Sequence, residues 1–334
     1  MTIAVLPSNT PSVMVKDMLR RADAYERIGV AFDHTSINRN QGASIIRSRA
    51  VNAAISTVPE PEGQNPTTQA VTLESYNGTM QRYSAAYAAS AYTVDLSPLD
   101  WVKMQTGVLM TQVKSTRERI RYNAALSGTN VIYNSAAIAQ RVDVNGVITL
   151  GRLQKAVTGI EESKGETFTS AGSGSNKVGS SATEASFLCF VSSTAHPDIR
   201  NLPGFTKRNE MTGSGYPPGT FGGVDNIVFV TSPEFVPFLG AATNTVNATF
   251  KSTGTFADVY PFILCARGAL SDVNLGGSGQ KGYGNVNVNV LDKADKSDIS
   301  NSRIVVSADW YDLAMLVSYD WLVRIECCVT ANPA

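Results

Sequence analysis

The chain has 334 residues, enough for one large domain or two moderate domains that each bury a hydrophobic core. Hydrophobic residues make up 43%, as in globular proteins, but charged residues make up only 17%, against about 25% in an average domain. The net charge is zero and like charges do not cluster, which argues against a protein that lives by binding nucleic-acid phosphates. So little charge favours a surface covered by other chains, or the neutral polar surface of a stable extracellular domain.

The sequence carries no targeting or membrane signal that we can identify. The first seven residues lack a basic start, and their apolar stretch is too short for a signal peptide. No apolar run approaches the roughly 18 residues that span a bilayer. Three of the four cysteines lie in apolar, strand-like runs, where they are typical of small buried side chains. We therefore expect a cytosolic protein with reduced thiols.

The first hundred residues predict a helix followed by an arm of strands. Residues 12–32 have apolar positions at helical spacing, which predicts an amphipathic helix with His34 at its end. Residues 44–58 are strand-like, and residues 58–69 contain three prolines and a glycine, which predicts an extended, exposed loop. Residues 72–92 predict paired strands around Asn77-Gly78, a typical hairpin turn. Strands on both sides of a long loop predict a two-stranded projecting arm.

The strongest helix signal follows the arm. Ser97 suits an N-cap, Pro98 suits the first helical position, and Asp100 supplies an acid three residues after the cap. Apolar residues and threonines then recur at spacings of three and four, and Gly128 supplies a stop. The pattern predicts a helix over 97–128, about 30 residues and roughly 45 Å long.

The rest of the chain mixes short helices and strands. A helix capped by Thr149 is predicted over 150–162, and a flexible Gly/Ser-rich excursion over 165–186. Strands are predicted at 187–192, 227–231, 262–270 and 286–290, and the segments RIVVSA, DLAMLV and WLVRIECCV predict three final strands. No internal repeat is present. These elements give an α+β fold class.

Residues that could carry catalysis are scarce. Neither His34 nor His196 shares a motif with a serine, cysteine or acid, so a catalytic triad or a histidine metal site is not expected. His196, which precedes a proline, is expected to be a turn residue. Residues 277–282 match G-x-G-x-x-G, but a strand follows them where a dinucleotide site needs a helix. Cys327 and Cys328 would face opposite sides of a strand, so they would neither share a metal nor form a relaxed disulfide. The sequence predicts no catalytic residue, no cofactor and no metal.

Three motifs and a turn carry a resemblance to a known family. They are Glu62-Gly-Gln-Asn-Pro66 in the arm, Leu126-Ser-Gly-Thr-Asn-Val-Ile-Tyr133 after the long helix, Trp321-Leu-Val-Arg-Ile-Glu326 near the end, and the segment HPDIRNLPGF. In this order and spacing the chain resembles the major capsid proteins of tailed phages, whose fold is named after phage HK-ninety-seven, and within them the branch typified by phage N-four. The resemblance spans roughly residues 60 to 326.

The resemblance implies five parts of the chain. They are an N-terminal arm at 1–41, an extended β-loop at 42–92, a peripheral domain with the spine helix at 93–147, an axial domain at 148–285, and return strands of the peripheral domain at 286–334. Residues expected to contact a neighbouring subunit are Pro59, Glu62, Gly63 and Pro66. Residues expected in a subunit contact or in the core are Trp321, Arg324 and Glu326. Ser97 and Asp100 are expected to cap the spine helix.

The implied function is mechanical. The chain would assemble with many copies of itself, as hexamers and pentamers, into an icosahedral shell that encloses double-stranded DNA without a sequence-specific DNA site. The expected partners are a scaffolding protein, a portal and a decoration protein, and no membrane is expected to be involved. The scaffold is expected to be a separate protein, because no long charged extension precedes the arm. The expected location is the virion, after assembly in the host cytoplasm. The first alternative function is an encapsulin-type shell that encloses protein cargo. The second is an enzyme, a hydrolase whose paired carboxylates are distant in sequence.

Overall fold

The computed structural model describes residues 26–51, 70–97, 100–168, 185–211, 216–244, 249–276, 286–293 and 298–331, with isolated positions between 55 and 68. Within these residues the helices are α1 (Ala91–Leu96), α2 (Trp101–Leu126), α3 (Leu150–Glu162) and α4 (His196–Arg200), with 3-10 turns η1 (Ile28–Ala31), η2 (Arg141–Asp143) and η3 (Ser193–Ala195). The predicted helix over 12–32 falls mostly outside the described residues. Its described end is η1, and His34 lies in the strand that follows, not at a helix end.

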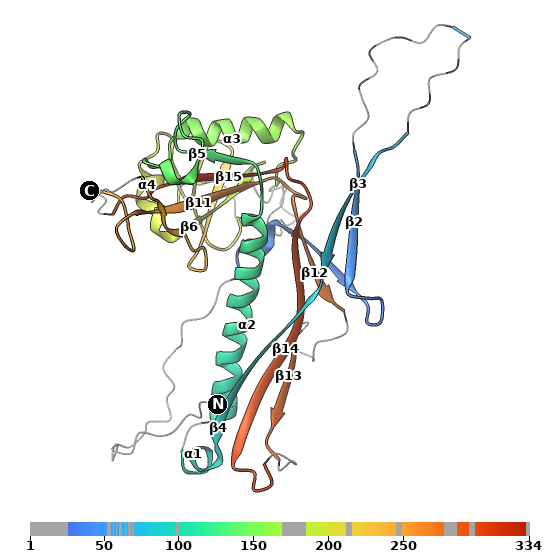
Figure 1. Cartoon of the computed structure of the whole chain (residues 1–334), viewed down its shortest axis with the longest axis vertical. Helices are drawn as coiled ribbons and strands as arrows, with labels where there is room; N and C mark the ends of the chain where they lie inside the picture. Colours follow the sequence, from blue (N-terminus) through green and yellow to red (C-terminus); the bar gives the residue numbers. More distant parts are fainter. Residues whose placement is uncertain are drawn as a thin grey trace.

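The described strands form three sheets (Figure 1). The five-stranded sheet contains β1 (Phe32–Ile37), β12 (Leu270–Leu275), β14 (Arg303–Leu316), β13 (Val286–Leu291) and β4 (Gln81–Ser90). The eight-stranded sheet contains β5 (Val131–Tyr133), β15 (Leu322–Cys327), β11 (Ala257–Cys265), β6 (Phe187–Ser192), β9 (Ile227–Ser232), β8 (Thr220–Val224), β7 (Thr206–Lys207) and β10 (Phe238–Ala242). The third sheet pairs β2 (Ser44–Ala50) with β3 (Leu73–Thr79). The α+β class is confirmed.

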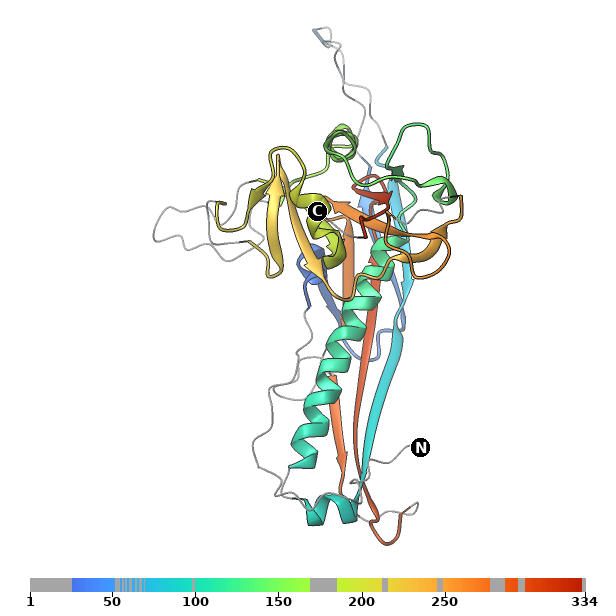
Figure 2. The same cartoon turned by 90° about the vertical axis from the view of Figure 1, so that its left-hand side faces the viewer.

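A long limb is built from α2 and the strands β4, β13 and β14. β14 pairs with β4 along one edge and with β13 and then β12 along the other. Every second residue of β14 faces α2, so that Val306 and Trp310 pack against Leu109 and Val113 of the helix. Figure 2 shows α2 running along this one face of the sheet. Among the described residues, no helix covers the opposite face.

A compact unit lies at one end of the limb (Figure 1). Its central strands β6, β9 and β11 are buried on both faces, as their unbroken apolar sequences require. Leu153 and Ile160 of α3 cover one face, and Tyr122 of α2 with Phe235 covers the other. The end of the long helix is therefore part of the core of this unit, which joins unit and limb into one body.

Two predicted strand arrangements near the long helix are wrong. Asn77-Gly78 makes no hairpin, because β3 runs through it and continues beyond Met80 as β4. Gly78 is instead a close approach to β14, since a Cβ there would lie 2.3 Å from Met315 Cε. The segments RIVVSA and DLAMLV form one strand, β14, and not two.

The last strand also departs from the expected return to the limb. β15 pairs with β11 and β5 in the eight-stranded sheet, whereas β14 belongs to the five-stranded one. The turn at 318–320 therefore passes the chain from one sheet to the other. Trp310 packs against the long helix, whereas Trp321 packs between the two main clusters of the compact unit.

Candidate functional site

The projecting arm exposes apolar side chains that the single chain does not cover. β2 and β3 pair antiparallel over seven positions, from Ser44 opposite Thr79 to Ala50 opposite Leu73. The side chains of Ile46 and Leu73 are 67% and 63% exposed. A two-stranded ribbon is marginally stable alone, and a row of exposed apolar residues marks an interaction surface. The arm is therefore a candidate contact surface for another chain.

The predicted contact residues lie beyond these strands. Pro59, Glu62 and Gly63 are exposed, and Gly63 has a φ of +83°, the left-handed conformation that favours glycine in a turn. Pro66 lies outside the described residues. Their exposure is compatible with the expected subunit contact, but nothing in the single chain tests it, so that contact stays a prediction.

Arg49 links the two strands of the arm to the body of the molecule. Arg49 of β2 donates a hydrogen bond to Ser318 Oγ at 2.7 Å and pairs with Glu74 Oε2 of β3 at 3.1 Å. Its guanidinium carbon lies 4.8 Å from the centre of the Trp321 ring, a cation–π distance. Arg49 thus ties both arm strands to the turn between the two large sheets.

Of the two residues predicted to cap the long helix, Asp100 does so and Ser97 does not. Asp100 is the N-cap of α2, where its carboxylate accepts a 3.0 Å hydrogen bond from Lys103 N. Ser97 is not the cap of this helix; it ends the preceding helix α1, and its N–H bonds to Thr93 O. Two residues of the motif could each serve as a cap, and the helix begins at the later one.

The Trp321–Glu326 motif belongs to the interior of this chain. Glu326 is completely buried, and Arg141 and Arg324 lie within 2.7 and 2.8 Å of its carboxylate. Trp321 donates its Nε1–H to Ser163 O at 2.9 Å. Of the two roles expected for these residues, a subunit contact or the core, the structure gives Glu326 the core role.

A second buried charge cluster joins α2 to the five-stranded sheet. Arg121 donates to Asp272 Oδ2 at 2.5 and 2.8 Å, and His34 Nδ1 lies 3.3 Å from the same oxygen. Arg117 Nε is 3.7 Å from Oδ2 of Asp312, which is almost fully buried. Burial, and then the charge of Asp272, raise the pKa of Asp312 to about 7.

The pKa values of the other groups in this cluster shift in the directions that their surroundings explain. Burial alone would raise the pKa of Asp272, but the hydrogen bond with His34 and the charge of Arg121 outweigh it and lower the pKa. The same hydrogen bond raises the pKa of His34. Glu118, one turn away on α2, accepts hydrogen bonds from the backbone N–H groups of Arg27 and Ile28, and burial raises the pKa of its carboxyl. Two neighbouring carboxyls with pKa values pushed apart resemble a catalytic pair, but both of these side chains are buried between α2 and the five-stranded sheet.

The other candidate chemical groups are also structural. The four cysteines are buried and unpaired, and burial raises the pKa of each thiol, which disfavours the nucleophilic thiolate. Cys327 and Cys328 face different hydrophobic clusters, as their adjacency predicted. His196, expected in a turn, is instead the first residue of α4, and its ring stacks on Phe221 with 4.1 Å between the centroids.

Metal ligands and membrane-spanning helices are absent from the described residues. Among them, no cluster of three or more histidine, cysteine or acidic side chains is arranged to hold a metal ion. No helix in the described part of the chain is long and apolar enough to cross a membrane. The G-x-G-x-x-G segment lies outside the described residues, but β13 follows it, as predicted.

Exposed apolar side chains also gather at the far end of the limb. There α1, the end of β13 and the turn before β14 meet (Figure 1). Tyr92, Leu291 and Ile299 are all exposed, Ile299 to 86%. The sequence gives no signal of this surface, because Tyr92 is about 200 positions from the other two residues and each alone is an ordinary apolar residue.

Comparison with known proteins identifies the fold. No protein-family model matches the sequence, and no curated protein matches it significantly. Solved structures do match. The capsid of Ralstonia phage GP4 aligns with a TM-score of 0.65 at 10% identity over 100% of both chains. The acidic stable capsid structure of Helicobacter pylori bacteriophage KHP30 aligns with a TM-score of 0.64 at 10% identity over 95% of both. The cyanophage Pam1 capsid asymmetric unit aligns with a TM-score of 0.60 at 10% identity over 98% of this chain and 99% of that one. Limb, compact unit and arm together form the HK-ninety-seven-like fold of tailed-phage capsid structures.

Proposed function

We propose that the chain is the major capsid protein of a tailed phage, a structural subunit and not an enzyme. The observation that carries the proposal is the end-to-end match of the fold to a phage capsid, over 100% of both chains. An arm with uncovered apolar side chains and a surface with only 17% charged residues fit a protein whose surface is largely covered by its own copies.

Each part of the molecule has a role in this proposal. The arm lies over a neighbouring copy, the limb forms the peripheral domain, and the compact unit forms the axial domain that meets its copies around five-fold and six-fold axes. Because β15 pairs inside the compact unit, the axial domain includes residues 322–327 as well as the expected 148–285. The shell encloses DNA without specific contacts and belongs to the virion. A scaffolding protein, a portal and a decoration protein are proposed partners, and the motifs in the arm, after the long helix and in the last strand favour the N-four-like branch.

The encapsulin alternative is not favoured, since the capsids of phages GP4, KHP30 and Pam1 all share the fold of this chain. The burial of the carboxyl pair and of the four thiols fits structural roles for these groups, which supports a non-enzymatic function.

Self-assembly is the direct test. The protein, expressed with the scaffold encoded beside it, should elute as megadalton particles that electron microscopy shows as closed shells. A 35.6 kDa monomer under every condition would contradict the proposal.

The arm is tested separately. Deletion of residues 59–69 should preserve the circular dichroism spectrum and reduce shell yield. A Gly/Ser replacement of equal length serves as the matched control, because it keeps the chain length and removes only the side chains. Normal shells from both variants would show that the arm does not hold neighbours together.

A further inference from the structure

Two buried aspartates meet between α2 and the five-stranded sheet with too few hydrogen-bond donors. Asn274 of β12 lies opposite Asp312 of β14, so Asp272 is the diagonal neighbour of Asp312 on the same face. Asp272 Oδ1 and both carboxyl oxygens of Asp312 have no hydrogen-bond partner among the described residues. Arg121 donates only to Asp272 Oδ2, and Arg117 Nε stays 3.7 Å from Asp312 Oδ2. Three buried acceptor oxygens without a donor are unfavourable if both carboxyls are ionised.

The charges packed around the pair favour one bound proton. Two guanidinium groups stand against three buried carboxyls, so full ionisation would leave one negative charge uncompensated in the interior. The oxygens of Glu118 accept backbone N–H bonds and suit a carboxylate, whereas those of Asp312 accept none, which assigns the proton to the aspartate pair. The charged and titratable groups around the pair are Arg117, Glu118 and Arg121 of α2, His34 of β1, Glu26 before η1, and Tyr83 of β4.

The same cluster holds residues 26–34, the first described segment of the chain. Arg121 Nη1 lies 3.9 Å from Glu26 Oε2 while the same guanidinium bonds to Asp272. At the other end of the segment, His34 Nδ1 lies 3.3 Å from Asp272 Oδ2. Among the described strands, β1 pairs with β12 alone and is an edge of its sheet. The charged contacts of this segment therefore converge on Arg121 and Asp272.

Loss of a shared proton would weaken this attachment. The two aspartates would carry like charges within hydrogen-bonding range of each other, and both would compete for Arg121. Water that reaches the uncompensated charge relieves its cost, and a local opening is easiest at a sheet edge. Glu26 and His34, whose side chains are 36% and 54% exposed, mark residues 26–34 as the thinnest cover of the cluster.

We propose that Asp272 and Asp312 share one proton that holds residues 26–34 against α2, and that its release above neutral pH opens this segment. The O–H bond of the protonated carboxyl breaks, the proton passes to water, and the cluster gains one negative charge. Burial and the charge of Asp272 raise the pKa of Asp312 to about 7, which agrees with release in this range. The inference goes beyond the proposed function and does not depend on it, because all these contacts lie within one chain.

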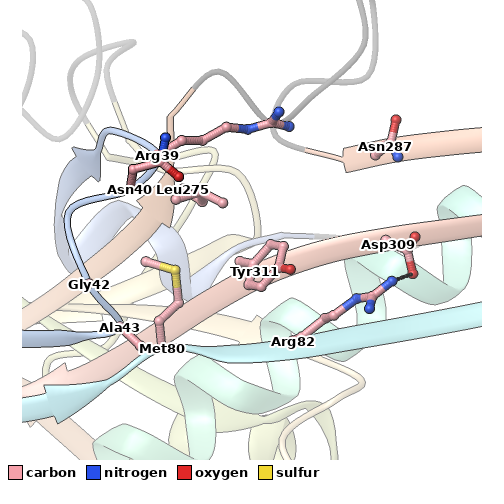
Figure 3. Close-up of a pocket in the computed structure, with 10 residues that line it drawn as sticks. All are labelled: Arg39, Asn40, Gly42, Ala43, Met80, Arg82, Leu275, Asn287, Asp309 and Tyr311. Carbon is pink, nitrogen blue, oxygen red and sulfur yellow. Dashed lines mark ion pairs between the residues drawn. The ribbon is translucent and has the colours of Figure 1, made fainter.

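Asp309 provides a matched control on the same strand. It lies three positions before Asp312 and so faces the opposite side of the sheet, where it lines a hollow of ≈ 520 Å³ at the base of the arm (Figure 3). The turn between β1 and β2 and the adjoining parts of β4, β12, β13 and β14 form this hollow. Asp309 Oδ1 pairs there with Arg82 Nη2 at 3.1 Å, so Asp309→Asn removes a charge from the strand without touching the buried pair.

Infrared spectroscopy of the unassembled subunit detects the proton. A protonated carboxyl has a carbonyl stretch that a carboxylate lacks. The difference between the native chain and Asp312→Asn should contain this band at about pH 6 and lose it by about pH 8.5. Asp272→Asn removes the neighbouring negative charge and should move the midpoint of this loss to lower pH. Absence of the band at about pH 6 would show that both carboxyls are ionised and would overturn the proposal.

Hydrogen exchange measures the opening of the segment. After correction for the intrinsic effect of pH, the protection of backbone amides 27–34 in the native chain should fall about tenfold between about pH 6 and 8.5. Amides of β11 should change much less, which distinguishes local opening from unfolding. Asp312→Asn places a neutral amide donor beside Asp272 and should keep the protection, whereas Asp309→Asn should lose it as the native chain does.

Two results would overturn the assignment. Unchanged protection of residues 27–34 in the native chain would show that the proton does not hold the segment, and this measurement needs no variant to fold. A decline that persists in Asp312→Asn would assign the opening to another group, with His34 the first to examine because it contacts Asp272.

Discussion

The guanidinium group of Arg141 donates two hydrogen bonds to the carboxylate of Glu326, from Nε to Oε2 and from Nη2 to Oε1, each 2.7 Å long. The two residues are 185 positions apart, and the contact fixes η2 against the last strand of the compact unit. Glu326 is fully buried, so it depends on its arginine partners for compensation of its charge. The same guanidinium lies 3.7 Å from the centre of the Phe238 ring.

Removal of Arg141 is expected to be costly. Arg141→Met keeps much of the side-chain volume but leaves Glu326 with Arg324 alone, which should lower the free energy of unfolding by about 3 kcal/mol. Urea unfolding of the unassembled subunit measures this. Arg152→Met on α3 is the control and should change the value by less than about 0.5 kcal/mol. Equal effects of the two substitutions would show that the buried pair contributes little.

The buried Asp312 should make the subunit less stable as pH rises through neutrality. Its pKa is about 7 in the folded chain against about 4 in an unfolded one, so the folded state holds the proton more tightly. Stability is then greatest at the acid end of this window and declines until the pH passes about 7. His34 acts in the same direction, because its raised pKa gives a stabilisation that is lost at higher pH. Asp272, whose pKa is lowered, loses its contribution only in acid, outside this window.

Asp312→Asn tests this pH dependence. The neutral amide should retain stability above pH 7 and remove most of the decline, about 2 kcal/mol, between pH 5.5 and 8.5. Thermal unfolding across that range provides the measurement. Asp309→Asn, on the same strand but paired with Arg82 at the surface, should preserve the decline. A decline that persists in Asp312→Asn would assign the titration to another group.

Substitution by alanine is expected to have opposite effects on stability at two glycines. A Cβ on Gly222 would lie 2.2 Å from Phe205 Cζ and 2.7 Å from the backbone oxygen of Thr206, so Gly222→Ala should destabilise by about 1–3 kcal/mol. Gly159, inside α3, has open space at its Cβ position, and Gly159→Ala should stabilise by about 0.5–1 kcal/mol through helix propensity. Denaturant midpoints of the two variants should move in opposite directions. A raised midpoint for Gly222→Ala would contradict the packing argument, and a lowered midpoint for Gly159→Ala would contradict the helix-propensity argument.

The apolar end of the limb should matter for assembly and not for folding. Ile299→Ser alters a side chain that is 86% exposed, so the free energy of unfolding of the subunit should stay within about 0.5 kcal/mol. Shell formation should need a higher protein concentration, because an apolar contact with another subunit is lost. Light scattering of assembly reactions measures the threshold. Leu109→Ala, in the limb interior, is the contrasting variant and should cost about 2–5 kcal/mol of subunit stability. Unchanged assembly of Ile299→Ser would place this end of the limb at a free surface of the shell.

Local patterns in the sequence predicted the elements that depend on local interactions. The strict alternation at 286–290, the apolar run at 187–192 and the amphipathic segment at 150–162 became β13, β6 and α3. Each pattern matches the side that the element buries, so the prediction needed no knowledge of partners.

Errors arose where distant contacts decided the outcome. The two predicted segments RIVVSA and DLAMLV left out Asp309, Trp310 and Tyr311, which β14 includes. Asp312 tolerates burial because Arg117 of α2 faces it, which no neighbouring residue in the sequence indicates. Asn77-Gly78, a sequence that favours a turn, is extended here because both residues pair with β2 as part of β3. The arm was predictable from its prolines, whereas the hollow at its base combines five separate strands and turns and had no sequence signal.

The passage of β3 directly into β4 has a mechanical consequence. β4 is hydrogen-bonded to β14 in register over ten positions, from Gln81 opposite Asp312 to Ser90 opposite Arg303. A pull on the arm along the strand axis loads this whole ladder in shear, so its hydrogen bonds must fail together and cannot be peeled apart one at a time. The chain that forms the arm is thus anchored through β4 by the hydrogen bonds to β14. Tension between subunits is therefore spread along the length of the limb.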